Sequence, residues 1–180
     1  PYFTSRRRLA IVGKMLRDNA FAPGETYHCF TRGVNKQIIF TGENDYRRFV
    51  ALLLVCNGHD NVHFSNLLAK YQDDAPRAYR HIFENEIPEE RLVHIVAYSL
   101  MPNHIHLILA EHTEGGISKF TQRLFTAYSM YINKKLERTG PLFERPFKSR
   151  HVGNESYFRW IFSYVHLNPL ALVAPAWEER

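Results

Sequence analysis

Residues 91–110, RLVHIVAYSLMPNHIHLILA, contain two apolar runs that are separated by Met101, Pro102 and Asn103. Val, Ile and aromatic side chains favour strands, and a Pro-Asn pair between two such runs is typical of a tight turn. The stretch therefore predicts two adjacent antiparallel strands joined as a hairpin. The remaining elements can be placed relative to this hairpin.

The segments on either side of the hairpin complete a β-α-β-β-α-β order with one further helix. Before it, a strand-like segment at 26–33 precedes a helical segment at 44–58 that ends at a glycine. After it, residues 115–140 have helical apolar spacing, a short strand is expected at 147–152, and 154–169 predict a helix with Asn154 as its N-cap and Pro169 as its stop. The order predicts an α+β fold: a ferredoxin-like split βαβ antiparallel sheet with an additional C-terminal helix.

The length of 180 residues and an apolar content of 45% predict one domain. We expect a basic N-terminal arm at 1–26, which carries Arg6, Arg7 and Arg8, and a single domain at 27–175. Residues 58–91 are polar and contain the breakers DDAP and IPEE. We interpret them as an insertion or a long helical connection rather than as part of the core.

The composition favours a cytoplasmic protein with a polyanionic partner. The net charge of +5 points first to nucleic acid. The two cysteines, Cys29 and Cys56, form no CxxC motif, which fits a reducing compartment. Apolar runs of about seven residues are too short to cross a bilayer, so we expect no membrane association.

The hairpin places two histidines on one face of a strand. Side chains alternate along a strand, so His104 and His106 point to one face, whereas Ile105, Leu107 and Leu109 point to the other. Both imidazoles could bind one cation, and without a carboxylate or thiolate such a site would stay open to water and to a phosphate oxygen. The alternative is a pair of ordinary, partly buried strand histidines.

The last predicted helix contains YVHLNP at 164–169, in which Tyr164 and Asn168 share one face. If this face packs over the histidines, Asn168 could supply an oxygen ligand and Tyr164 would lie beside the cation. The alternative is that Tyr164 is a core aromatic and Asn168 a C-terminal helix cap. Tyr128 and Tyr131 are rival nucleophiles, but they follow an apolar period and are expected in the core.

Together these motifs resemble the single-tyrosine HUH transposases, and within that IS200-like family the branch of REP-associated tyrosine transposases. MPNHIHL and YVHLNP carry the resemblance most specifically, in this order and at this separation. The resemblance extends over YHCFTRGVNKQIIF, NDYRRF, GPLFERPFKSRHV and SYFRWIFSYVHLNPL, from about residue 27 to about residue 170, and its N-terminal part is the softer match. The segment 58–91 departs from the family by its length and acidity, and Pro146 in FERPF departs from its usual Arg spacing.

The resemblance implies an enzyme that nicks and joins single-stranded or hairpin, REP-like DNA through a 5′-phosphotyrosine. It assigns the nucleophile to Tyr164 and a metal site to His104, His106 and Asn168. Two imidazoles and one amide oxygen suit Mg²⁺ or Mn²⁺ with open positions for the scissile phosphate. The REP-associated branch also favours a monomer that keeps its tyrosine helix in cis.

Basic and aromatic residues elsewhere are candidates for DNA binding. We expect phosphate contacts from Arg6, Arg7, Arg8, Arg145, Lys148 and Arg150, and stacking surfaces from Phe143, Phe147 and Tyr157. The alternative is a solvated basic loop with aromatic residues in the core. Lys134, Lys135 and Arg138 are interpreted as the solvated end of an amphipathic helix.

Two other functions remain open from the sequence. A metal-dependent nuclease could use water as its nucleophile and keep Tyr164 for structure alone. A protein of this fold could also bind structured nucleic acid without cleaving it. Covalent attachment of DNA to the protein separates the transposase from both alternatives.

Overall fold

The computed structural model describes residues 21–174 except 60–63, 72–73 and 86, so Arg6, Arg7 and Arg8 lie outside the described residues. The elements follow in the order β1 (Thr26–Arg32), η1 (Val34–Lys36), α1 (Glu43–Val55), α2 (Phe64–Lys70), α3 (Ala75–Asn85), β2 (Val93–Met101), β3 (His104–Glu111), α4 (Gly116–Lys135), β4 (Lys148–His151), α5 (Glu155–Leu167) and η2 (Asn168–Leu172). None of the helices in the described ranges is long and apolar enough to cross a membrane.

The four strands form one antiparallel sheet with the order β2-β3-β1-β4. β2 and β3 are joined by a tight turn at Pro102 and Asn103, as the sequence predicted. The sheet order and the β-α-β-β-α-β succession are those of the predicted split βαβ sheet, and α5 is the additional C-terminal helix. The predicted fold class is confirmed.

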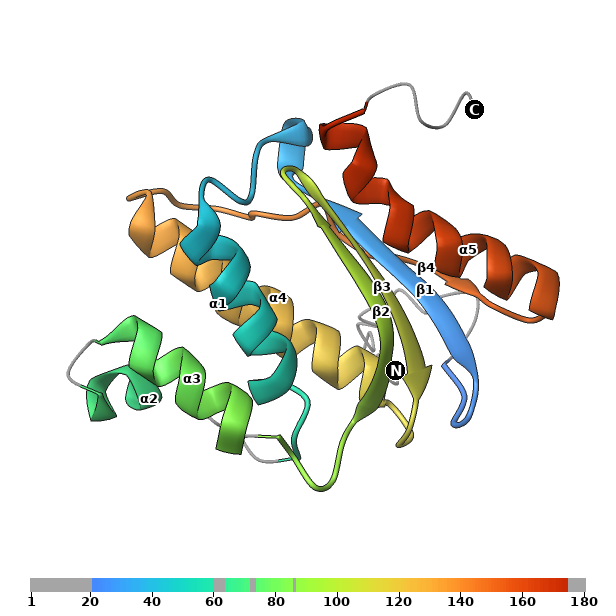
Figure 1. Ribbon diagram of the computed structural model, residues 1–180, viewed down its shortest axis with the longest axis horizontal. Helices are drawn as coiled ribbons and strands as arrows, with labels where there is room; N and C mark the ends of the chain where they lie inside the picture. The colour runs from blue at the N-terminus through green and yellow to red at the C-terminus, as the bar shows by residue number, and fades with distance from the viewer. Residues whose placement is uncertain (1–20, 60–63, 72–73, 86, 175–180) are drawn as a thin grey trace, which may run out of the picture.

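The helices lie in separate layers on the two faces of the sheet. Figure 1 shows α1 and α4 on one face and α5, in red, on the other. Strand alternation explains the division, because Ile105, Leu107 and Leu109 are fully buried on the α1/α4 face. They pack in a large apolar cluster with residues such as Phe49 of α1 and Phe120 of α4.

The segment between α1 and β2 is helical, but part of it belongs to the core. Phe64 of α2 and Tyr79 and Ile82 of α3 are buried in the same apolar cluster as the central strands. The segment was predicted as an insertion or a long helical connection outside the core. It contains α2 and α3, and its exclusion from the core was wrong. Its apolar side chains are spaced singly among many charged ones, which hides their contribution in the sequence.

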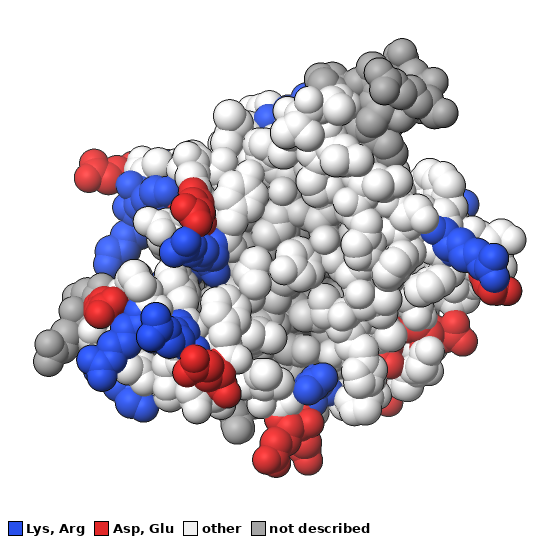
Figure 2. Space-filling view, in the orientation of Figure 1, with Lys and Arg blue, Asp and Glu red and all other residues white. Residues whose placement is uncertain are grey.

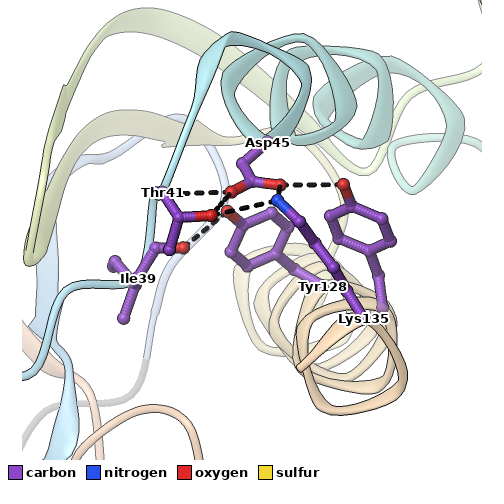
Figure 3. A network of polar contacts seen from close by, with 6 residues as sticks. Ile39, Thr41, Asp45, Tyr128 and Lys135 are labelled. Atoms are coloured by element: carbon purple, nitrogen blue, oxygen red, sulfur yellow. Dashed lines mark hydrogen bonds and ion pairs between the residues drawn. The ribbon is translucent and has the colours of Figure 1, made fainter. Parts of the chain in front are cut away.

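A buried carboxylate links the start of α1 to the end of α4 (Figure 3). Asp45 is fully buried and accepts hydrogen bonds from the Thr41 backbone and hydroxyl (2.8 and 2.7 Å), the Tyr131 hydroxyl (2.8 Å) and the Lys135 ammonium (2.6 Å). The Tyr128 hydroxyl donates to the Ile39 carbonyl at 2.8 Å. Lys135 was expected at the solvated end of its helix, but it instead neutralises Asp45.

The position of α5 follows from its cap and from a small apolar cluster. The Asn154 side chain accepts a hydrogen bond from the Tyr157 backbone at 2.8 Å, which confirms the predicted N-cap. Ile161 and Val165 are buried against Ala97 of β2 and Ile108 of β3. This packing holds α5 against the face of the sheet opposite α1 and α4.

Candidate active site

The strand register gathers histidine, aromatic and basic side chains on the face under α5. His106 of β3 is paired with Phe30 of β1, which is paired in turn with Lys148 of β4. Residues two apart along a strand share a face, so the same face carries the side chains of His28, Phe30, Arg32, His104, His106, Lys148 and Arg150. The sheet thus places the two histidines of the predicted metal site beside two of the predicted DNA contacts, Lys148 and Arg150.

The rings of His104 and His106 lie close together, and each has a hydrogen-bond partner at its Nδ1 atom. Their centroids are 5.2 Å apart with the planes nearly perpendicular, a separation that lets both rings reach one ion. His104 Nδ1 donates to the Asn103 side-chain oxygen at 2.7 Å, which fixes the tautomer and leaves the Nε2 lone pair available. Within the described part of the chain, neither Nε2 atom takes part in a hydrogen bond.

His28 is a site residue that sequence reasoning missed. Its Nε2 lies 2.9 Å from Nδ1 of His106, and both rings are buried. Donation from His106 Nδ1 to His28 leaves His106 Nε2 free in the same way as in His104. Alternation along β1 places His28 on the same face as Phe30, but only the register of β1 against β3 puts it next to His106.

Burial keeps these imidazoles neutral. Burial lowers the pKa of His106 to about 3, with smaller contributions from His28 and His104, and it lowers the pKa of His28 to about 4, with a contribution from the Arg150 charge. Burial also lowers the pKa of His104. A neutral imidazole is the form that binds a metal ion, so the three rings are in the ligating state at neutral pH.

Helix α5 brings Tyr164 to the histidines within the same chain. The Tyr164 ring lies edge-on to His106, with centroids 5.5 Å apart and an interplanar angle of 86°. The rival Tyr128 is fully buried on the other side of the sheet, and burial raises the pKa of both Tyr128 and Tyr131. A core location is therefore confirmed for Tyr128, whereas Tyr131 is partly buried and packs against the same apolar cluster.

Asn168 is buried at the end of α5. It is the C-cap residue, and its backbone N–H bonds to the Tyr164 carbonyl. Its side-chain nitrogen is buried and has no hydrogen-bond partner among the described residues, so the fold does not fully use this amide. No hydrogen bond joins it to either histidine in those residues, and its role as a ligand stays a prediction.

The donor set around the histidines has the chemistry of an open metal site. Among the residues that the structure describes, no group of three His, Cys, Asp or Glu side chains could hold a metal ion. The sequence predicts the Asn168 amide oxygen as the third ligand, and this role stays a prediction. Two neutral imidazoles and an amide oxygen fit Mg²⁺ or Mn²⁺ with several positions left open.

A pocket of about 370 Å³ opens beside the histidines. Basic side chains of Arg32, Lys36 and Lys148 line it, and Arg32 is paired with Glu144 at 2.7 Å. Arg32 and Lys36 were also missed. The position of Arg32 depends on the pairing of β1 with β3, and that of Lys36 depends on the path of the loop after β1. The pocket presents positive charge next to the candidate metal ligands, as a phosphate site requires.

The predicted DNA contacts divide between several places. Lys148 lines the histidine pocket, and the Arg150 guanidinium lies 4.5 Å from the centre of the Tyr157 ring. Arg145 lines a second groove, between α4 and the segment before β4. Phe143 is buried in the core, so its prediction as a stacking surface was wrong, and Phe147 packs against the same cluster.

Charge is unevenly distributed over the surface. In the view of Figure 2, Lys and Arg side chains gather mainly over the layer of α1 to α4, while the middle of this face is largely uncharged. Net charge alone therefore does not locate the candidate site. The basic side chains beside the histidines are instead identified by the register of β1 and β4.

Comparisons with known proteins identify a matching protein family and similar solved structures. The family model described as "Transposase IS200 like" matches residues 68–168. No curated protein sequence matches the chain. Among solved structures, a REP-associated tyrosine transposase bound to a REP hairpin is 14% identical, with 86% of this chain and 72% of that chain covered and a TM-score of 0.49. A candidate transposase from Deinococcus radiodurans R1 is 13% identical, with coverages of 84% and 96% and a TM-score of 0.43.

The matched segment starts in α2 and contains the hairpin, α4, β4 and α5. It therefore includes His104, His106, Tyr164 and Asn168, the four residues predicted for the catalytic and metal site. The match covers more than half of the chain. The chain belongs to the IS200-like transposase family.

Proposed function

We propose that this transposase is a metal-dependent enzyme that nicks and rejoins DNA through a covalent bond to Tyr164. The observation that carries the proposal is the contact between the Tyr164 and His106 rings, which brings an attacking group and a candidate metal ligand together in one chain. A water-using nuclease has no need of a tyrosine in this place. A protein that only binds nucleic acid has no need of the tyrosine and the histidine pair together.

In the proposed reaction the Tyr164 oxygen attacks phosphorus in the DNA backbone. The tyrosine loses its proton, a phosphotyrosine bond forms to the 5′ side, and the bond to the 3′ oxygen breaks and leaves a 3′-hydroxyl. Strand transfer is the reverse reaction, in which a 3′-hydroxyl attacks phosphorus and releases Tyr164. The phosphotyrosine conserves the bond, so rejoining needs no nucleotide cofactor.

Protein groups around the tyrosine have distinct roles in this scheme. His104 and His106, with Asn168 as the third ligand, would hold Mg²⁺ or Mn²⁺, which would neutralise charge on the non-bridging phosphate oxygens. Asn103 and His28 orient the two imidazoles through their Nδ1 atoms. Lys36 and Lys148 line the pocket and would bind the flanking phosphates.

The proposed substrate is single-stranded or hairpin DNA, which follows the sequence resemblance to the REP-associated branch. We further propose that residues 27–175 form the catalytic domain and that the arm before it, with Arg6, Arg7 and Arg8, adds phosphate contacts. Because α5 packs on the sheet of its own chain, a monomer can hold the complete set of residues. The reaction fits a cytoplasmic protein that acts on cellular DNA.

The test is covalent capture of DNA. The chain is incubated with Mn²⁺ and a labelled pool of DNA hairpins that carry randomised single-stranded flanks, and the adduct is resolved by denaturing electrophoresis. Wild type is expected to give an adduct that is lost with Tyr164→Phe. Tyr98→Phe is the matched control, because Tyr98 is an exposed tyrosine of β2 that lies outside the site, and it should leave the adduct unchanged.

Each contrary result rejects the proposal in a specific way. An adduct that persists in Tyr164→Phe would exclude Tyr164 as the nucleophile. Cleavage without an adduct would support the water-using nuclease. Binding of hairpins with neither cleavage nor an adduct would support the non-catalytic binder.

A further inference from the structure

Three aromatic rings form a continuous stack along α5. The rings of Tyr157 and Trp160 have centroids 5.8 Å apart at 19°, and those of Trp160 and Tyr164 are 5.4 Å apart at 14°. At one end of this α5 stack, Tyr164 meets His106. At the other end, the Arg150 guanidinium lies over the Tyr157 ring. The stack therefore connects the basic strand β4 with the candidate active site.

The middle ring of the α5 stack is the exposed one. Trp160 is 58% exposed, and it does not belong to the apolar cluster beneath α5, which Tyr157 and Tyr164 both contact. The centroid separations exceed the contact distance of about 3.5 Å between stacked carbon atoms. Nearly parallel rings at these separations are not in full face-to-face contact, and more than half of Trp160 stays accessible to solvent between its two neighbours. Burial of apolar surface does not account for a tryptophan here.

We propose that Trp160 is a base-stacking subsite that holds a nucleobase of single-stranded DNA beside Tyr164. The inference rests on the proposed function, because it assigns Trp160 to the substrate of that reaction. An unpaired base has an open π face, and stacking on an aromatic side chain is tolerant of sequence. Arg150 and Lys148 on the adjoining strand supply positive charge for the backbone of the same strand of DNA.

A second aromatic row on α5 serves as an internal comparison. Phe158 stacks on Phe162 at 5.8 Å, and Phe162 contacts His166 at 4.2 Å. Phe162 is two residues from both Trp160 and Tyr164, so it projects from a nearly opposite side of the helix. It is 38% exposed, yet it has no ring contact with His106 among the described residues. Phe162→Leu is therefore the matched control for the loss of an exposed aromatic ring.

The experiment measures stacking without cleavage. Tyr164→Phe keeps the stacked ring and removes the attacking oxygen, and Trp177→Phe leaves Trp160 as the sole tryptophan. In this background, without a divalent ion, a short oligothymidylate is expected to quench the tryptophan emission. A labelled oligothymidylate should bind about tenfold more weakly to Trp160→Leu, whereas Trp160→Phe and Phe162→Leu should retain most of the affinity.

An abasic strand of the same length separates stacking from charge. It is expected to bind equally to the proteins with and without Trp160, because it offers phosphates and no bases. Absence of quenching, equal affinity of Trp160→Leu for oligothymidylate, or an equal loss for the abasic strand would overturn the inference. Thermal unfolding of Trp160→Leu checks that the fold is retained, and Trp160→Phe provides the same comparison with a ring in place.

The two proposals can fail separately. If the tryptophan emission is quenched and the affinity depends on bases, but the wild-type protein forms no adduct, Trp160 remains a stacking subsite and Tyr164 is rejected as the nucleophile. An adduct that forms at the wild-type rate in Trp160→Leu, with unchanged affinity, would keep the nucleophile and reject the subsite.

Discussion

The two faces of the sheet bury polar side chains in opposite ways. On the α1/α4 face, Asp45 is fully buried, and its charge is matched by Lys135 and by three further hydrogen bonds. On the α5 face, His28 and His106 are buried, and burial holds their pKa values at about 4 and about 3. The α1/α4 face thus buries a charged group together with an oppositely charged partner, whereas the α5 face buries imidazoles in their neutral form.

This difference separates stability from chemistry. The hydrogen-bonding capacity of the Asp45 carboxylate is satisfied within the protein, because this group links α1 to α4 beside a large apolar cluster. The imidazoles on the α5 face keep ring nitrogens that the fold does not use, under a helix held by a small cluster. We therefore expect substitutions on the first face to lower the free energy of unfolding, and those on the second to change metal and DNA binding.

Asp45→Asn, on the α1/α4 face, is expected to have the largest effect, which is a loss of free energy of unfolding. The change leaves the Lys135 ammonium beside a neutral group, and a broken buried pair costs about 2–4 kcal/mol in the free energy of unfolding where one partner is partly exposed. Urea unfolding at pH 7 measures it. Glu43→Gln is the control, because Glu43 and Arg47 form an exposed pair of the same helix, which contributes little.

The stability difference between wild type and Asp45→Asn is expected to depend on pH. Burial alone would raise the pKa of Asp45, but the hydrogen bonds from Lys135, Thr41 and Tyr131 outweigh it and hold the pKa below its ordinary value of 3.8. A lowered pKa stabilises the folded state above the ordinary value, and this contribution is lost as the pH falls through the folded pKa. The difference in stability between wild type and Asp45→Asn should thus shrink below about pH 4. A difference that grew with acid would contradict the assignment.

A smaller effect is expected from His28→Leu on the opposite face. The change removes the hydrogen-bond partner of His106 Nδ1 while keeping a buried side chain. Loss of such an orienting partner lowers metal affinity about 10- to 100-fold. Titration calorimetry with Mn²⁺ measures it, and His94→Leu is the control, since His94 and His112 form a similar but exposed pair at 3.1 Å. Unchanged Mn²⁺ affinity in His28→Leu would separate His28 from the site.

The smallest effect is expected from Tyr128→Phe, which removes one buried hydroxyl. Its hydrogen bond to the Ile39 carbonyl contributes about 1 kcal/mol, and the loss leaves that carbonyl without this donor. The free energy of unfolding should fall by this amount while the yield of the DNA adduct stays unchanged. Loss of the adduct at full stability would make Tyr128 the nucleophile and reverse the assignment of the two faces.

The sequence predicted the fold and the pair of histidines because both depend on local patterns. Alternation alone placed His104 and His106 on one face, and helical spacing placed Tyr164 and Asn168 on another. His28 and Arg32 could not be placed in the same way, because their proximity to His106 and Glu144 depends on the pairing of distant segments. The role of Lys135 was hidden for the same reason, since its partner Asp45 lies 90 residues earlier.

Whether one chain contains a complete catalytic site is tested most directly by mixing two defective chains. Tyr164→Phe and His106→Ala are co-expressed, purified together and incubated with Mn²⁺ and the labelled hairpin pool. Because α5 packs on its own sheet, each chain should lack one essential group and the mixture should form no adduct. An adduct on the His106→Ala chain would show that Tyr164 acts on the histidines of a second chain, and would contradict the account.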